Sequence, residues 1–505
     1  MSRESAEKEL RDFERRIRAR ARNWHPVQMI NFAEARVRDA KEQVSKLVLF
    51  PPHHLAHAIE ACCAYGTKDR NSLRTDAEFA AFIQILADAP DPVTTHALRE
   101  KRDVMEFLLL MGRQQFAWQN ASGALPFGRF ARIFCTLDRN HPNGLSFPAI
   151  LRSVFIVHAV GYRRFALDAD PREALDYVKL AVGDLQDFIQ KYSTTTHDLG
   201  VRYDRIRTDE SPLRWRHLRY GLEVTPIIRR EGRLVVPIPP YVLNLLAERV
   251  YFECAKSGDR ELVDEIAERW EEYCVEVLCL HPSTRHVLSE QQLRSPTRKG
   301  CDAVFEADDY LLFVECKCIV LEREFATTTA LHDPASSIAE GVVQLVESAR
   351  RINDGEFGAD KRAIKKRLGW ICVMNAVPLL NTDSFWDIAI LPKVREASVS
   401  NEELQELFET RPQIIDSEGL ESAVLGAKKA GKSLPAMYRD KVGNPAERES
   451  DWKNFGIQYG GAELTEDLAY WRNWIEKWIP PIDETQRAAL AESAATGDAT
   501  STPSN

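Results

Sequence analysis

The sequence predicts an α+β protein with a mostly helical N-terminal half and strands in its C-terminal half. Two observations lead to this fold class. Across residues 5–189, apolar residues recur at the three-to-four spacing of amphipathic helices, as in "EALDYVKLAVGDLQDFIQKY". Near residue 300, two apolar runs flank a turn in "GCDAVFEADDYLLFVECKCIV", a pattern typical of a β-hairpin.

The order of elements divides the chain into successive segments. Residues 1–220 are expected to form a helical domain of unknown role. Residues 221–258 contain a first hairpin, "LEVTPIIRREGRLVVPIPP", and a connecting helix, and the prolines restrict this hairpin to a sheet edge. Residues 259–400 then read as a long helix, the second hairpin with its turn at 308–309, a helix from about residue 336, and the buried strand "LGWICVMNAVPLL".

The end of the chain is expected to be helical and then disordered. Residues 401–486 contain helical patterns such as "LESAVLGAKKA" and a tryptophan-rich segment. Residues 487–505 lack large apolar side chains, so we expect no packed structure there.

Composition excludes several classes of protein. The chain has 505 residues, 44% of them hydrophobic and 28% charged, as in globular proteins of two or three domains. No run approaches the roughly 18 apolar residues of a membrane span, and the charged N-terminus lacks a signal-peptide core. Ten cysteines without a CxxC pair indicate reduced thiols, hence a cytoplasmic protein. The net charge of -9 argues against a uniformly basic surface but allows a local basic cleft.

The second hairpin carries charged residues inside apolar strands. Because side chains alternate along a strand, Glu315 and Lys317 share one face of "LLFVECKC", and Cys316 and Cys318 share the other. Asp302 lies on the partner strand, where the hairpin returns it to the same neighbourhood. Two carboxylates and one ammonium group are therefore expected in a small space.

These groups suit a divalent metal and a phosphate. Two carboxylate ligands suit Mg2+, which keeps several waters and accepts phosphate oxygens. A bound metal lowers the pKa of its water and offsets charge on the phosphoryl group, and a lysine beside it can hold the attacking water or the phosphate. The [DE]-x-K pattern also occurs at Asp39 and Asp451, but only Glu315 lies in an apolar strand.

The segment "CDAVFEADDYLLFVECKC" resembles the core of the PD-(D/E)xK nuclease superfamily, in its Mrr-like, restriction-endonuclease-like branch. The resemblance implies an α/β/α core of a helix, a three-stranded meander carrying D…ExK, a second helix and a further strand. It implies that Asp302 and Glu315 are metal ligands and that Lys317 is the catalytic lysine.

Two helices adjoin this motif, and the resemblance assigns residues on both. On the preceding helix, "RWEEYCVEVL" supplies Glu271, with Glu272 as the alternative, and on the following helix "EGVVQLVESA" supplies Gln344. Ser348 stands where RecB-like members have a tyrosine, and no proline precedes Asp302. The resemblance covers about a quarter of the chain and leaves the helical N-terminal half unassigned.

The implied function is metal-dependent endonucleolytic hydrolysis of DNA, with Mg2+ as cofactor and Mn2+ as a substitute. DNA is favoured over RNA as the nucleic-acid partner. One site cuts one strand, so double-strand cleavage needs a homo-oligomer or sequential nicking. By analogy, large bacterial proteins that join such a nuclease to an unrelated domain act in restriction or anti-phage defence. The helical half could then recognise a substrate, a signal or a protein partner.

Other interpretations stay open. Glu315 and Lys317 could form a structural ion pair, or the fold could be catalytically silent and bind nucleic acid through "RYDRIRTDESPLRWRHLRYG" and "KRAIKKR". A helical interaction scaffold is the third possibility. Cys301, Cys316 and Cys318 are expected to be small buried apolar residues rather than a thiolate cluster.

Overall fold

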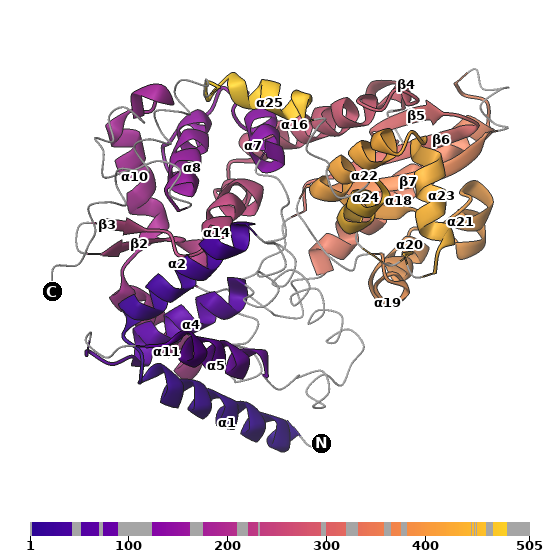
Figure 1. Ribbon diagram of the computed structural model, residues 1–505. Coiled ribbons are helices and arrows are strands. Elements are labelled where there is room, and N and C mark those ends of the chain that lie inside the picture. The colour runs from indigo at the N-terminus through magenta and orange to yellow at the C-terminus, as the bar shows by residue number, and fades with distance from the viewer. Residues whose placement is uncertain are drawn as a thin grey trace. The chain divides into compact units, whose positions relative to one another are not determined.

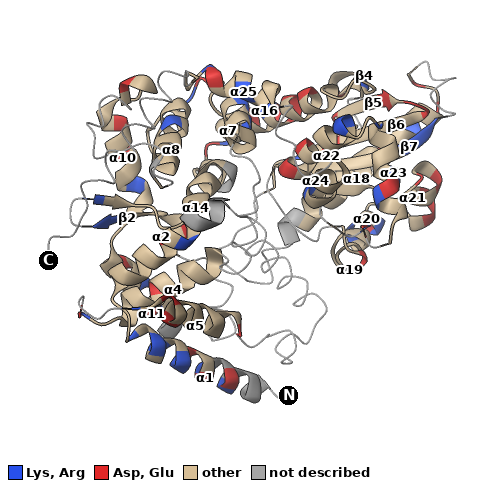
Figure 2. Ribbon diagram, in the orientation of Figure 1, with Lys and Arg blue, Asp and Glu red and all other residues tan. Residues whose placement is uncertain are grey.

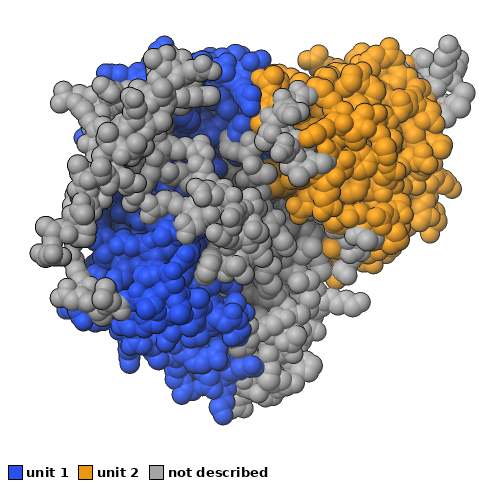
Figure 3. All heavy atoms as spheres, in the orientation of Figure 1, with its two compact units in different colours: residues 1–99, 117–257, 472–505 blue, residues 100–116, 258–471 orange. Residues whose placement is uncertain are grey.

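The computed structural model divides into two compact units, each described here by itself (Figure 3). Unit 1 comprises Met1–Arg99, Ala117–Ser257 and Arg472–Asn505, and unit 2 comprises Glu100–Phe116 and Gly258–Trp471. The structure describes residues 3–42, 52–69, 74–88, 124–161, 175–209, 221–230, 233–293, 299–319, 332–357, 365–374, 381–445, 447–448, 450, 452–460 and 468–481. The tail at 487–505 and much of the two basic segments (210–220 and 361–364) lie outside these ranges.

Unit 1 is mainly helical, as the sequence predicts (Figure 1). Its core holds apolar side chains from α1, α2, α4, α5 and α11, which pack into one cluster. The helical elements are α1 (Arg3–Ala21), α2 (Pro26–Glu42), α4 (Pro52–Tyr65), α5 (Asp76–Ala87), α7 (Ala124–Ile133), α8 (Phe147–Gly161), α10 (Val182–Tyr192), α11 (Thr196–Asp209), α13 (Gly221–Val224), α14 (Pro239–Asn244), η1 (Leu245–Arg249) and α15 (Val250–Lys256).

A small three-stranded sheet belongs to unit 1 as well. The predicted first hairpin is present as β2 (Ile227–Arg230) and β3 (Arg233–Val235), which pair antiparallel, with β3 at the edge. The two-residue strand β1 (Ser193–Thr194) pairs parallel with β2 and was not predicted. A pattern of two residues is too short to distinguish a strand from a loop.

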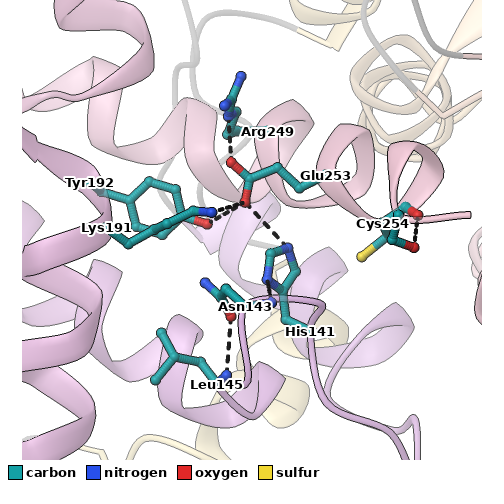
Figure 4. Close-up of polar contacts among 9 residues, drawn as sticks. His141, Asn143, Leu145, Lys191, Tyr192, Arg249, Glu253 and Cys254 are labelled. Atoms are coloured by element: carbon teal, nitrogen blue, oxygen red, sulfur yellow. Dashed lines mark hydrogen bonds and ion pairs between the residues drawn. The ribbon is translucent and has the colours of Figure 1, made fainter. Parts of the chain in front are cut away.

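A partly buried glutamate joins α15 to other parts of unit 1 (Figure 4). Glu253 accepts hydrogen bonds from Arg249 Nε at 2.7 Å and from the Tyr192 hydroxyl at 3.0 Å. Lys191 Nζ lies 3.8 Å from the same carboxylate, and His141 Nε2 lies 3.5 Å from it. Since these partners come from α10, η1 and the loop before α8, the cluster fixes three segments around one carboxylate.

Charged residues of both signs are spread along α1 (Figure 2). Arg18 Nε lies 3.7 Å from Glu14 on the same helix, and Arg15 pairs with Asp12. The Arg18 guanidinium also lies over the Tyr65 ring, 4.6 Å from its centroid. Several charged side chains of this helix therefore interact with other residues of unit 1. Among the helices that the structure describes, none is both long and apolar enough to cross a bilayer.

Unit 2 contains a five-stranded mixed sheet in the order β4-β5-β6-β7-β8. β4, β5 and β6 are antiparallel neighbours, and β6, β7 and β8 run parallel. The strands are β4 (Arg285–Ser289), β5 (Ala303–Ala307), β6 (Tyr310–Lys317), β7 (Lys366–Val373) and β8 (Gln413–Asp416). The predicted hairpin is β5–β6, and its turn places Asp308 at φ +54°.

Helices cover both faces of this sheet (Figure 1). On one face, α18 (His332–Asn353) packs its apolar side chains against Leu311, Phe313 and Ile371. On the other face lies α16 (Arg260–Cys279), where the Trp270 ring N–H donates to the Cys372 carbonyl at 3.4 Å. The fold class is therefore α+β, as predicted, with a layered C-terminal unit. The helix α18 begins at His332, four residues before the predicted start.

The remaining elements of unit 2 are short helices. The predicted "NEELQELFE" and "LESAVLGAKKA" helices are present as α21 and α22. Among the described residues these helices are α17 (Glu290–Leu293), α19 (Asp383–Phe385), η2 (Trp386–Ile390), α20 (Leu391–Glu396), α21 (Asn401–Leu407), α22 (Ser417–Lys429), α23 (Leu434–Gly443) and α24 (Trp452–Gly460). The tryptophan-rich segment forms α25 (Ala469–Glu476), which contains the boundary between the two units.

Candidate functional site

The end of strand β6 places a glutamate and a lysine side by side. Glu315 and Lys317 lie on the face of the sheet that α18 covers, two residues apart, as strand alternation predicts. Lys317 Nζ lies 2.7 Å from Glu315 Oε1. Glu315 is only 1% exposed, whereas the Lys317 side chain keeps 17% of its surface. The ammonium group therefore lies between a buried carboxylate and solvent.

Asp302 reaches the same end of β6 through the β5–β6 pairing. Its backbone N–H donates to the Val314 carbonyl at 3.1 Å, which continues the ladder by one residue. Its carboxylate accepts a hydrogen bond at Oδ2 from the Cys316 N–H, at 2.6 Å. A backbone donor from the residue between Glu315 and Lys317 thus orients the Asp302 side chain.

Helix α18 adds two residues to the site from the face of the sheet that it covers. Gln344 Oε1 accepts a hydrogen bond from Lys317 Nζ at 2.7 Å. One turn earlier, Gly341 lies so close that an added Cβ would stand 3.2 Å from Glu315 Cγ and 3.4 Å from Lys317 Cε. Ser348 has a different role, because its hydroxyl accepts the backbone N–H of Cys301, next to Asp302, at 2.8 Å.

The two adjacent glutamates of α16 differ in their surroundings. Glu271 is partly buried and interacts electrostatically with Asp302 and Lys317. The Glu272 side chain is 48% exposed and pairs with Arg269, 3.0 Å away. The structure therefore brings Glu271, and not Glu272, to the other predicted residues.

The carboxyl groups here hold raised pKa values. Burial raises the pKa of Asp302 from 3.8 to about 7, and the Glu290 charge adds to the effect. Burial and the Asp302 charge raise the pKa of Glu271 to about 8 and that of Glu315 well above its ordinary value. For Lys317, burial opposes the charged form, but the Glu315 carboxylate outweighs it and raises the lysine pKa. Burial is therefore the main reason that these carboxyl groups favour the protonated form, and the charges of neighbouring acids add to it.

The donor set fits a hard divalent cation. Glu315 Oε2 is buried and accepts no hydrogen bond from any residue that the structure describes. An ionised carboxylate oxygen in the interior is costly unless a proton or a cation meets it. Asp302 and Glu315 both supply oxygen, the atom that Mg2+ and Mn2+ prefer as ligand. These two side chains are therefore suited to hold such an ion.

Sequence reasoning missed two residues of this neighbourhood. Gly341 could have been noticed, because an isolated glycine inside a helical pattern usually has a packing reason. Glu290, whose charge acts on Asp302 and Glu271, follows the unpredicted strand β4 and matches no motif.

A separate cavity of unit 2, of about 780 Å³, contains none of the predicted residues. Its walls include Arg411, Arg439 and Glu409. Arg411 pairs with Asp383 at 2.8 Å, and Arg439 lies 3.7 Å from Glu409. Arg411 and Arg439 are thus already close to acids, and the third arginine of the wall, Arg448, donates its Nε–H to the Val442 carbonyl at 3.0 Å, so the function is not assigned to this cavity.

Comparisons of the chain with protein-family models, with curated proteins and with solved structures found no match.

Proposed function

We propose that this chain is a metal-dependent endonuclease that hydrolyses phosphodiester bonds in DNA. The observation that carries the proposal is the convergence of Asp302, Glu315 and Lys317 at the end of β6, where Glu315 Oε2 accepts no hydrogen bond from the described residues. The resemblance of this segment to the PD-(D/E)xK nucleases supports the same conclusion. Mg2+ is the proposed cofactor, with Mn2+ as a substitute.

Asp302 and Glu315 would hold the ion, which when bound makes a coordinated water more acidic and offsets charge on the phosphate. Both side chains are set by the strands. Asp302 is oriented by the Cys316 N–H, and Glu315 by its place on β6. Glu271 lies within electrostatic reach of Asp302 and would accept a proton or orient a water there.

Lys317 would act on the phosphate or on the attacking water. Two of its three N–H donors meet Glu315 Oε1 and Gln344 Oε1, both at 2.7 Å. The third N–H would donate to a substrate oxygen. The raised pKa keeps the lysine protonated at neutral pH, so its role is that of a fixed positive charge rather than a base.

The resemblance extends the proposal to the products and the biological setting. It implies 5′-phosphate and 3′-hydroxyl ends, and DNA as the substrate in preference to RNA. A homo-oligomer would allow both strands of a duplex to be cut. We propose a role in restriction or anti-phage defence, with the helical unit recognising a partner or a signal, on the analogy stated above.

A cleavage assay tests the proposal. Plasmid DNA, single-stranded DNA and RNA are incubated with the full chain and Mg2+ or Mn2+, beside an EDTA control. We expect DNA cleavage that EDTA abolishes and that Lys317→Ala and Asp302→Asn each reduce by at least about 100-fold. The matched controls Lys432→Ala and Asp440→Asn, which remove an exposed ion pair, should cleave like the wild type.

Three results would overturn the proposal in different ways. Metal-independent DNA binding without cleavage indicates a catalytically silent binding module. Absence of both binding and cleavage, with a co-purifying protein, indicates an interaction scaffold. Cleavage that survives both Lys317→Ala and Asp302→Asn places the activity elsewhere or in a contaminant.

A further inference from the structure

Three cysteines converge on the opposite face of strand β6. Cys274 of α16, Cys316 of β6 and Cys372 of β7 have sulfur atoms that all lie within 4.8 Å of one another. All three side chains are buried. Sequence reasoning grouped Cys316 with Cys301 and Cys318 instead. The structure brings Cys316 together with two cysteines that lie far away in the sequence.

The fold holds these sulfurs in place from both strands and a helix. Cys316 and Cys372 are direct register partners on the parallel strands β6 and β7, so their side chains leave the same face next to each other. Helix α16 crosses that face and brings Cys274 to them, with Trp270 one turn earlier bonded to the Cys372 carbonyl. The three donors are thus fixed by the sheet and by helix packing rather than by a loop.

The spacing matches the coordination distance of a metal held by sulfur. Metal–sulfur bonds of about 2.3 Å around one ion put the sulfurs of a trigonal set about 4.0 Å apart, which lies inside the observed limit. Thiolates are soft ligands that select Cu(I) and Zn2+ over Mg2+. A sulfur cluster is therefore chemically distinct from the oxygen donors on the other face.

Hydrogen bonds link the three sulfurs. Against the opposing effect of burial, the Cys274 and Cys316 thiols act on the Cys372 sulfur and lower the pKa of that thiol. A thiolate in this place is the form that binds a metal.

We propose that Cys274, Cys316 and Cys372 form a trithiolate site for a soft d10 metal cation. Binding replaces the S–H protons: starting from three neutral thiols, Zn2+ gives a Zn(S)3 complex of charge -1 and three protons. With Cu(I) the same three thiols give a complex of charge -2 and three protons. The proposal does not rest on the nuclease assignment, because the site lies on the other face of β6.

The site has a consequence for Asp302. The Cys316 residue that would bind the metal through its sulfur also donates its N–H to the Asp302 carboxylate. Metal at the sulfurs would therefore restrain the peptide that orients Asp302. Metal binding should lower the mobility of both Cys316 and Asp302. This makes the trithiolate site a candidate structural brace for the end of β6.

Anaerobic metal loading tests the site. The full chain is reduced, stripped of metal with a chelator, and offered Cu(I) or Zn2+ in separate arms, during expression and after purification, because the sulfurs are buried. Bound metal is counted by mass spectrometry, and thiolate-to-metal charge transfer is followed in the ultraviolet. We expect about one equivalent of at least one ion with a charge-transfer band, and a higher Tm in the loaded protein.

Cysteine variants make the assignment specific. Cys274→Ala, Cys316→Ala and Cys372→Ala should each lose the bound equivalent and the band. Cys135→Ala, which removes another buried thiol, and Cys318→Ala, one residue beyond the end of β6, should keep both. The proposal is overturned if the folded wild type binds neither ion, if binding survives Cys372→Ala, or if Cys318→Ala abolishes it. The wild-type result decides the question even where a variant fails to fold.

Discussion

Gly341 lies directly against Glu315, because a Cβ on Gly341 would stand only 3.2 Å from Glu315 Cγ. Gly341→Val would push branched atoms into this contact and displace Glu315 together with Lys317. We expect DNA cleavage to fall by at least about tenfold. The measurement is the initial rate of metal-dependent cleavage.

A second helical glycine provides the control for this variant. Gly183 is the second residue of α10, and a Cβ added there would meet nothing within 4 Å, so Gly183→Val should leave cleavage unchanged. Equal rates for Gly341→Val and the wild type would show that the position of Glu315 does not matter to the activity.

Adjacent glutamates on α16 allow a matched comparison. Glu271→Gln removes a carboxylate within electrostatic reach of Asp302 and Lys317, whereas Glu272→Gln removes one that pairs with Arg269 at the surface. We expect Glu271→Gln to lower cleavage by at least about tenfold and Glu272→Gln to change it by less than twofold. If the two variants behaved alike, or in the reverse order, the assignment of Glu271 would be wrong.

The raised pKa of Asp302 predicts a pH-dependent stability. In the metal-free folded state this pKa is about 7 instead of 3.8, mainly through burial, so the folded protein holds the proton more tightly than the unfolded chain. The stabilising contribution of protonated Asp302 is complete below pH 3.8 and is lost as the pH rises through 7. The free energy of unfolding of Asp302→Asn should therefore equal that of the wild type near pH 4 and exceed it by about 1–2 kcal/mol at pH 8.

Urea unfolding in EDTA at several pH values measures this difference. Asp440→Asn is a control of opposite sign, because a hydrogen bond from Tyr459 and the nearby Lys432 lower the pKa of Asp440. That variant should not gain stability at pH 8. A metal-free Asp302→Asn protein less stable than the wild type at pH 8 would contradict the electrostatic account of the site.

The contacts of Glu253 predict that its removal destabilises unit 1. Glu253→Ala leaves the Tyr192 hydroxyl and the Arg249 guanidinium without their shared acceptor. We expect a loss of about 2–4 kcal/mol in the free energy of unfolding, measured with urea. Asp187→Ala, at an exposed position of α10, should cost less than about 0.5 kcal/mol. Equal effects of both variants would show that the cluster does not contribute to stability.

Local patterns were sufficient to predict part of the fold. The β5–β6 hairpin is long and apolar, so its strands, its turn and the shared face of Glu315 and Lys317 follow from alternation. The strands β4 and β8 were missed, since "RHVLS" and "QIID" are short and only partly apolar. Short strands like these form because neighbouring strands and helices cover them.

The candidate site was predicted where it depends on one hairpin and not where it depends on packing. Asp302 reaches β6 by strand pairing, which the sequence pattern predicts. Glu290 and Gly341 belong to the site only because α17 and α18 pack beside these strands. No local sequence pattern predicts how these helices pack on the sheet. The approach of Cys274 and Cys372 to Cys316 was not predicted for the same reason, because these cysteines meet only after α16 packs on the sheet.

The position of Mn2+ in crystals of the full chain tests the central claim most directly. Mn2+ replaces Mg2+ at oxygen ligands and is located by its anomalous scattering. The account predicts one strong peak between the carboxylates of Asp302 and Glu315, within reach of Lys317, and no peak there in Glu315→Gln. A wild-type crystal in which saturating Mn2+ leaves that place empty would contradict it.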